Sequence, residues 1–187
     1  MKAIIFDCFG VLVGKGFWNM YTLLGGDVKA DSEYIDQQLA KVDLGQLSSQ
    51  DFSQEMANRL GISIDKYTQA FREDERPNEA LFAYIKDELK PNYKLALVSN
   101  ATGDSVRRKI PADKLALFDE VLISGEVGIL KPDPRLFHMA LDRLGVEAHE
   151  TVFVDDHQEY IQGAKNVGLQ TIQFKDFDSF VRELQSL

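Results

Sequence analysis

Short apolar runs and helical patterns alternate along most of the chain. The runs at residues 3–6, 93–98, 120–123, 151–154 and 170–174 have the length and aliphatic character of strands buried on both faces of a sheet. Helical patterns lie between them, and two of these are sharply bounded, at 77–90 and at 134–144 before Gly145. This repetition predicts the α/β class, with a Rossmann-like parallel sheet between two layers of helices.

Residues 15–76 have a different pattern, with amphipathic helices and no convincing strand. A helical block inserted directly after the first strand is expected to form a small cap over the strand ends, where it would exclude water and select the substrate. We therefore expect a core domain of residues 1–14 and 77–187 and a cap domain of residues 15–76. The helices expected in the cap cover 32–42, 49–60 (with Ser48 as N-cap) and 65–73.

Polar residues follow the apolar runs at the points where the strands end. Asp7 follows the first run, Ser99 and Asn100 the second, and Asp155 with Asp156 the fourth. Lys131 lies in the loop after the third run. The carboxyl ends of parallel strands meet at one edge of a sheet, so these groups should converge there. Each residue alone could be an ordinary cap or turn, but together they are the parts needed for phosphoryl transfer.

The chemistry of these groups also predicts a metal ion. Three carboxylates held close together repel one another unless a hard divalent cation lies between them, and Mg²⁺ prefers such oxygen ligands. Lys131 can neutralise a carboxylate and a phosphate as a point charge. The Ser99 hydroxyl and the amide groups around Asn100 can donate hydrogen bonds to phosphate oxygens.

Charge, apolar runs and cysteine content limit the kinds of partner and the cellular location that can be expected. The formal net charge is -9, with 30 acidic and 21 basic residues, which argues against nucleic acid and anionic membranes as partners. No apolar run approaches the length of a membrane span, and the N-terminal run is broken by Asp7, unlike a signal peptide. The single cysteine, Cys8, cannot form an internal disulfide, which fits a cytoplasmic protein. We interpret Cys8 as a packing residue rather than a nucleophile, since no histidine lies near it in sequence.

Four segments carry a resemblance to a known family. They are Phe6-Asp7-Cys8-Phe9-Gly10-Val11, Val98-Ser99-Asn100, Gly128-Ile129-Leu130-Lys131-Pro132 and Val152-Phe153-Val154-Asp155-Asp156, the last continued through residues 161–168. In this order they resemble the four motifs of the haloacid dehalogenase-like (HAD) hydrolase superfamily, in the branch with a small helical cap. Within it, the chain looks most like the small sugar-phosphate phosphatases and the phosphatase domain of soluble epoxide hydrolases.

The resemblance implies roles for the residues at the strand ends. Asp7 would be the nucleophile and would form a phospho-aspartyl intermediate. Ser99, Asn100 and Lys131 would hold the phosphate in a substrate site that Phe9 adjoins. Mg²⁺ would be bound by the Asp7 carboxylate, the Phe9 carbonyl and Asp156, with Asp155 as a direct or water-mediated ligand. The substrate would be a small phosphorylated molecule.

Phe9 departs from the pattern of the family's phosphatases. Most of them carry a second aspartate here, as a proton donor and acceptor, and phenylalanine cannot transfer a proton. Proton transfer of this kind is worth roughly 10²–10⁴-fold in rate. Glu126, His157 or a residue of the cap could substitute for it.

Phe9 also leaves two other functions open. An aromatic residue at this position resembles the 2-haloacid dehalogenases, in which Asp7 would displace a halide that needs no proton. Asp155 and Asp156 argue against this, because the pair suits Mg²⁺ whereas dehalogenases work without metal. The cap also has no arginine near its start, which a dehalogenase would use for the substrate carboxylate; its only candidates are Arg59, Arg72 and Arg76. The third possibility is a protein that binds a phosphate ligand with little turnover.

The remaining candidates are weaker. His138 and His149 have no neighbouring metal ligands in the sequence, so we interpret them as surface or packing residues. Phe17, Trp18 and Met20 could line the substrate side of the cap, although an aromatic group at a helix start is more often part of a core.

Overall fold

The sheet is parallel and has five strands in the part of the chain described by the structure, a computed structural model that covers residues 1–14 and 16–187. Residue 15, the first of the expected cap, lies outside the described residues. The strand order is β3-β2-β1-β4-β5, with β1 at the centre. The strands are β1 (Ala3–Phe6), β2 (Lys94–Ser99), β3 (Glu120–Ile123), β4 (Thr151–Asp155) and β5 (Gln170–Gln173).

The central strand is buried on both faces, as its run of apolar residues predicts. All four of its residues are fully buried, and Ile5 lies opposite Ala96 of β2 and Phe153 of β4. Ile4 and Phe6 face one hydrophobic core, whereas Ala3 and Ile5 face the other. A strand covered on two sides needs apolar residues at every position, which is why no alternation is visible in its sequence.

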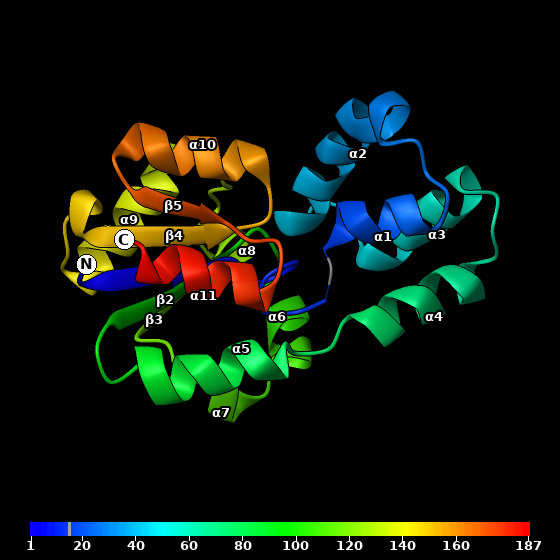
Figure 1. The fold of residues 1–187 in the computed structure, drawn as a ribbon. Helices are drawn as coiled ribbons and strands as arrows, with labels where there is room; N and C mark the ends of the chain where they lie inside the picture. The colour runs from blue at the N-terminus through cyan, green and yellow to red at the C-terminus, as the bar shows by residue number, and fades with distance from the viewer. Residues whose placement is uncertain (15) are drawn as a thin grey trace.

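Helices cover the two faces of this sheet and complete a three-layer α/β/α core (Figure 1). On one face, α5 (Glu79–Tyr84), its π-helical continuation (Ile85–Leu89) and α11 (Phe177–Gln185) pack on Ile4 and Phe6. On the other, α9 (Pro134–Leu144) and α10 (Gln158–Val167) pack on Ala3 and Ile5. The predicted fold class is thus confirmed. Short helices complete the core: α6 (Gly103–Lys109), α7 (Ala112–Leu115), α8 (Ser124–Val127) and a 3₁₀ turn at Ala148–Glu150.

A helical insert follows β1 and has a hydrophobic core of its own, separate from those of the sheet (Figure 1). Tyr21, Ile35, Phe52, Met56 and Tyr67 are buried in it. The predicted insert is confirmed, whereas its boundaries at residues 15 and 76 stay a prediction. Its helices are α1 (Phe17–Leu23), α2 (Val28–Asp43), α3 (Ser49–Arg59) and α4 (Ile64–Asp74).

Two of these helices differ from their prediction. No span was predicted for α1, although Phe17, Trp18 and Met20 were placed at a helix start, because the helix is short and begins after Gly16, which has no side chain to cap it. α2 begins four residues earlier than expected, because the Asp27 carboxylate accepts a hydrogen bond from the Ala30 amide and caps the helix there.

The two segments that connect the insert to the core run side by side. Val13 forms an antiparallel bridge with Pro77, and the Gly14 amide donates to the Arg76 carbonyl at 3.1 Å. The chain therefore leaves the core and returns to it at one place.

None of the described helices has both the length and the apolar character that crossing a membrane requires.

Helix α11 is held to the sheet by Phe180, whose ring centre lies 5.8 Å from that of Phe6. Phe180→Ala should lower the free energy of unfolding by about 3–5 kcal/mol, because it leaves a cavity in a close-packed core. Urea denaturation followed by circular dichroism measures this. The control Glu183→Ala, at an exposed position of the same helix, should stay within about 0.5 kcal/mol of the parent. Equal stability of the two variants would contradict the packing described here.

Candidate active site

The chain turns sharply after β1 and brings Asp7 to the carboxyl edge of the sheet. The amides of Leu12 and Val13 both donate to the Cys8 carbonyl at 2.9 Å, which closes the turn. Gly10 lies within it at a φ of +95°, and a Cβ atom there would be 2.4 Å from Asp156 Oδ2. Only glycine therefore allows this backbone to approach the Asp156 carboxylate so closely.

Lys131 is the centre of the site. Its side chain is fully buried, and Nζ donates to Asp7 Oδ1 at 2.5 Å and to Asp155 Oδ2 at 2.7 Å. The lysine thus joins the end of β1 to the end of β4. A buried ammonium ion is tolerable here because two carboxylates hold it.

Asn100 holds the backbone of Lys131 in place. Its Oδ1 accepts from the Lys131 amide at 2.8 Å, and its Nδ2 donates to the Lys131 carbonyl at 3.0 Å. The same Nδ2 lies 3.3 Å from the Tyr160 hydroxyl, and Lys131 Nζ lies 4.8 Å from the centre of the Tyr160 ring. The Asn100 side chain is therefore engaged with Lys131. Its role toward a phosphate stays a prediction.

Ser99 is the last residue of β2 and is fully buried. Its Oγ has no hydrogen-bond partner among the described residues. Ser99 is not among the residues that line the cavity described below. An unpaired buried hydroxyl is uncommon in proteins and is consistent with a partner that binds during function.

Asp7, Asp155 and Asp156 together could hold a metal ion. Each offers a carboxylate oxygen, and these oxygens lie within 4.8 Å of one another. The Phe9 carbonyl faces the same region, because a methyl group at Gly16 would lie 3.4 Å from it and 3.1 Å from Asp156 Oδ2. These oxygens are the hard donors that Mg²⁺ prefers, so the residues present fit that ion.

Burial and mutual repulsion raise the affinity of these carboxyls for protons. Burial raises the pKa of Asp7 to about 7, and Asp155 adds to the rise while Lys131 opposes it. Burial, Asp7 and Asp155 raise the pKa of Asp156 to about 8. Burial lowers the pKa of Lys131, but Asp155 and Asp7 outweigh it and raise that pKa, so the lysine stays charged. The carboxyl cluster thus lacks positive charge, which a divalent cation would supply.

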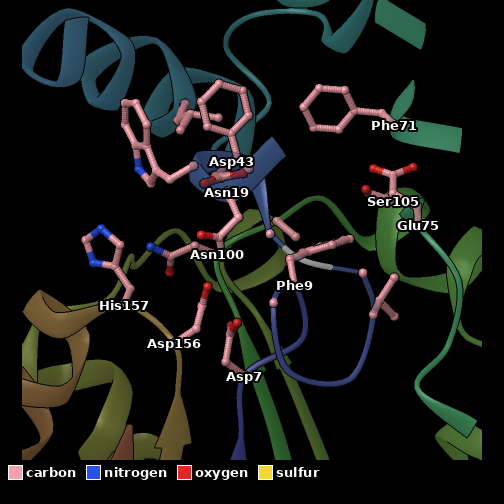
Figure 2. Close-up of a pocket in the computed structure, with 18 of the residues that line it drawn as sticks. Asp7, Phe9, Asn19, Asp43, Phe71, Glu75, Asn100, Ser105, Asp156 and His157 are labelled. Carbon is pink, nitrogen blue, oxygen red and sulfur yellow. The ribbon is translucent and has the colours of Figure 1, made fainter. Parts of the chain in front are cut away.

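A cavity of about 2030 Å³ lies between this edge of the sheet and the helical insert. Figure 2 shows Asp7, Asn100 and Asp156 approaching it from the core, with Phe71 and Asp43 above them from the insert. The structure therefore places the predicted residues Asp7, Phe9, Asn100, Lys131 and Asp156 on one cavity, whereas Ser99 and Asp155 lie buried behind it.

Phe9 lies on this cavity next to a cation rather than an acid. Lys109 Nζ is 4.7 Å from the centre of the Phe9 ring and forms an ion pair with Glu75. The sequence offers Glu126 and His157 as substitutes for the proton-transferring aspartate that Phe9 replaces. Glu126 is exposed, pairs with Arg107 at 2.6 Å and is not among the residues that line the cavity. His157 lines the cavity, and its Nδ1 is buried without a hydrogen-bond partner among the described residues.

The other candidates divide between packing and the cavity. Phe17 and Trp18 line the cavity and also pack on the core of the insert, whereas Met20 is buried. Arg72 lines the cavity and Arg59 pairs with Asp31, while Arg76 lies outside the lining. His138 and His149 are exposed. Cys8 is fully buried, and burial raises the pKa of its thiol. The thiol therefore stays protonated, which agrees with a packing role rather than a nucleophilic one.

Sequence analysis did not single out Asp43 and Tyr160, which both line the cavity. Tyr160 could have been found, because it lies in the first turn of the helix that follows Asp156 and so faces the strand ends. Asp43 gives no such signal, since it is one polar residue among many on α2.

One family model matches most of the chain. The family model described as haloacid dehalogenase-like hydrolase matches residues 27–174. A phosphoserine phosphatase of Thermus thermophilus is 42% identical over 92 residues, which are 48% of this chain and 37% of that protein. An (S)-2-haloacid dehalogenase 4A of Burkholderia cepacia is 31% identical over 120 residues, 63% of this chain and 51% of that protein. The chain thus spans about half or less of these relatives' lengths.

A solved structure supports the fold. A HAD family enzyme of Bacteroides thetaiotaomicron, in complex with magnesium and inorganic phosphate, superposes with a TM-score of 0.62 at 20% identity. The match covers 94% of each chain.

The carboxyl cluster should make stability depend on pH. Folded Asp7 and Asp156 keep their protons up to about pH 7 and about pH 8, whereas in the unfolded chain they ionise near pH 4. Between these values the folded state binds more protons, so the free energy of unfolding should fall as pH rises from about 5 to about 8, by on the order of 1 kcal/mol or more. Urea denaturation in EDTA measures this.

The control is Asp156→Asn, which removes one of the titrating groups and should make the decline less steep. Stability that rises over this pH range, or a slope that Asp156→Asn leaves unchanged, would contradict the electrostatics described here.

Proposed function

The chain belongs to the haloacid dehalogenase-like hydrolase family, and on this basis we propose that it is a Mg²⁺-dependent phosphatase of a small phosphorylated metabolite. The observation that supports this most is the Lys131 ammonium, which hydrogen-bonds to the Asp7 carboxylate beside a three-carboxylate cluster. A nucleophile, a fixed cation and a set of hard metal ligands at one cavity are the parts that phosphoryl transfer needs.

In this proposal Asp7, Asp155, Asp156 and the Phe9 carbonyl hold the Mg²⁺ ion. When bound, the ion offsets the negative charge of the cluster and of a phosphate oxygen. Asp155 already accepts a hydrogen bond from Lys131. In this proposal Asp155 is therefore the member of the acidic pair that lies farther from the metal ion. The magnesium and phosphate bound by the similar HAD family enzyme are consistent with this assignment.

The chain's own groups position the phosphate. Lys131 uses two of its three N–H groups on Asp7 Oδ1 and Asp155 Oδ2, so one remains for a phosphate oxygen. The same contact holds the Asp7 carboxylate in one orientation, with Oδ2 left to attack phosphorus. The unpaired Ser99 hydroxyl, close behind, could donate to a second oxygen after a small movement. The nucleophile is thus oriented before the substrate binds.

A second candidate is a 2-haloacid dehalogenase, in which Asp7 displaces halide from a small acid. It is favoured by Phe9, since halide leaves without a proton, and by the similarity to the Burkholderia cepacia dehalogenase. Arg72, on the cavity, could hold the carboxylate of such a substrate. The pair Asp155 and Asp156 favours the phosphatase, because with Asp7 it forms a three-carboxylate cluster that suits a divalent cation, which a metal-free reaction does not need. A phosphate-binding protein with little turnover is the remaining alternative.

The test is release of phosphate from p-nitrophenyl phosphate and a panel of sugar phosphates, with Mg²⁺ or with EDTA. We expect activity that needs Mg²⁺ and that falls by at least about 10³-fold in Asp7→Asn, because the amide cannot attack phosphorus. The matched control Asp142→Asn, at an exposed position of α9, should keep the parent's activity.

No release of phosphate under any of these conditions would overturn the phosphatase proposal. A metal-free assay of chloride release from 2-chloropropionate then separates the other two candidates. Chloride release that Asp7→Asn abolishes would identify the dehalogenase, whereas no release, combined with calorimetric binding of inorganic phosphate, would identify the binding protein.

A further inference from the structure

Asp43 brings a carboxyl group from the insert into the cavity that holds the nucleophile. It is the last residue of α2 and lines the cavity together with Asp7, Phe9 and Lys131. Figure 2 shows Asp43 approaching from the insert, while Asp7 and Asp156 approach from the sheet. A group in this position faces the part of a substrate that points away from the sheet.

The end of α2 is fixed to the core at this residue. The Asp43 carbonyl lies 3.3 Å from Ser124 Oγ, whose single proton it shares with the Ala101 carbonyl at 3.1 Å, and Ser124 is fully buried. The Ser124 hydroxyl is in turn held by Ala101, whose amide donates to it at 2.9 Å. Gly125 allows the end of α2 to approach the core, because a Cβ atom at this position would lie 3.0 Å from the Asp43 carbonyl. The backbone of Asp43 is therefore positioned by the core.

The Asp43 carboxyl is free to act on a ligand. It makes no hydrogen bond to any residue in the part of the chain that the structure describes. The ionisable groups that act on it are Lys131 and Asp7 across the cavity, and it acts in turn on Tyr160 of α10. Burial raises the pKa of Asp43 to about 8, with Lys131 opposing the rise and Asp7 adding to it. At neutral pH the group thus carries the proton that a general acid needs.

We propose that Asp43 is the proton donor and acceptor of the reaction, in the role that Phe9 cannot fill. This inference rests on the phosphatase function proposed above. The insert would then supply a catalytic group, in addition to covering the cavity.

In the proposed reaction, the proton of Asp43 goes to the leaving group and is later replaced by a proton from water. Asp7 Oδ2 attacks phosphorus, the bond from phosphorus to the ester oxygen breaks, and that oxygen takes the bonding electrons and the Asp43 proton to leave as an alcohol. Water then attacks the phospho-aspartyl group and gives a proton to the Asp43 carboxylate, while the bond from phosphorus to Asp7 breaks. Asp7 and Asp43 return to their starting forms, and the net reaction is hydrolysis of one phosphate ester.

Three other acids on or near the cavity are less suited. The Glu75 carboxylate is engaged by Lys109, and Glu126 by Arg107. Asp36 is exposed on α2, about two turns before Asp43. Asp43 combines a partly buried carboxyl, a backbone in contact with the core and a place on the cavity with Asp7.

The test compares kcat/KM for two substrates in the protein with Mg²⁺. Asp43→Asn should lower kcat/KM for an alkyl phosphate by roughly 10²–10⁴-fold but lower it for p-nitrophenyl phosphate by less than about tenfold. The reason is that p-nitrophenolate leaves without a proton, and kcat/KM reports only the steps up to its departure. Asp43→Glu, which keeps the carboxyl, should retain more alkyl phosphatase activity than Asp43→Asn.

Controls separate this role from a structural one. Asp65→Asn, at an exposed position of α4, should leave both kcat/KM values unchanged, and thermal melting should show that Asp43→Asn is folded. If Asp43→Asn does not fold, the kcat/KM values for the two substrates are measured with Asp43→Ser instead. Equal losses on both substrates, or no loss on either, would overturn the role of Asp43 while leaving the phosphatase in place. No phosphate release by the parent protein would overturn both proposals.

Discussion

The site depends on one buried lysine held between two carboxylates. Lys131 lies between Asp7 of the first strand end and Asp155 of the fourth, at 2.5 Å and 2.7 Å. Without this cation, the carboxylates of the cluster would repel one another in a largely buried region, which would oppose the approach of the strand ends. The side chain of Asn100 fixes the lysine backbone through two hydrogen bonds. Three neighbouring strands are thus joined through one residue, by its side chain and its backbone.

The parallel sheet and the residues at its edge could be predicted from the sequence, because both depend on short-range patterns. A strand buried on both faces must be apolar at every position, and β1 and β3 match their predicted spans. Parallel strands also end at the same edge, so Asp7, Asn100 and Asp156, just after apolar runs, could be assigned to one site with Lys131 of the loop after the third run. Magnesium and the individual roles of these residues stay predictions.

What could not be predicted depends on contacts between distant parts of the chain. Asp43 reaches the cavity because α2 ends against Ser124, which is 81 residues away in sequence. Ser99 belongs to the right strand end, yet the packing around it leaves its hydroxyl behind the cavity. The span of α1 could not be predicted for a local reason, because a short helix after a glycine has no capping side chain to mark its bounds.

The paired connections between insert and core have an evolutionary consequence. Because Val13 bridges Pro77 and Gly14 bonds to Arg76, the two ends of the insert are neighbours in space. A segment whose ends are adjacent can be lengthened, shortened or exchanged for another without moving the strands it leaves and rejoins. The nucleophile and its lysine can therefore stay constant while the substrate side of the cavity changes by recombination. A chimaera that carries the insert of a relative between these two connections is a direct way to change specificity.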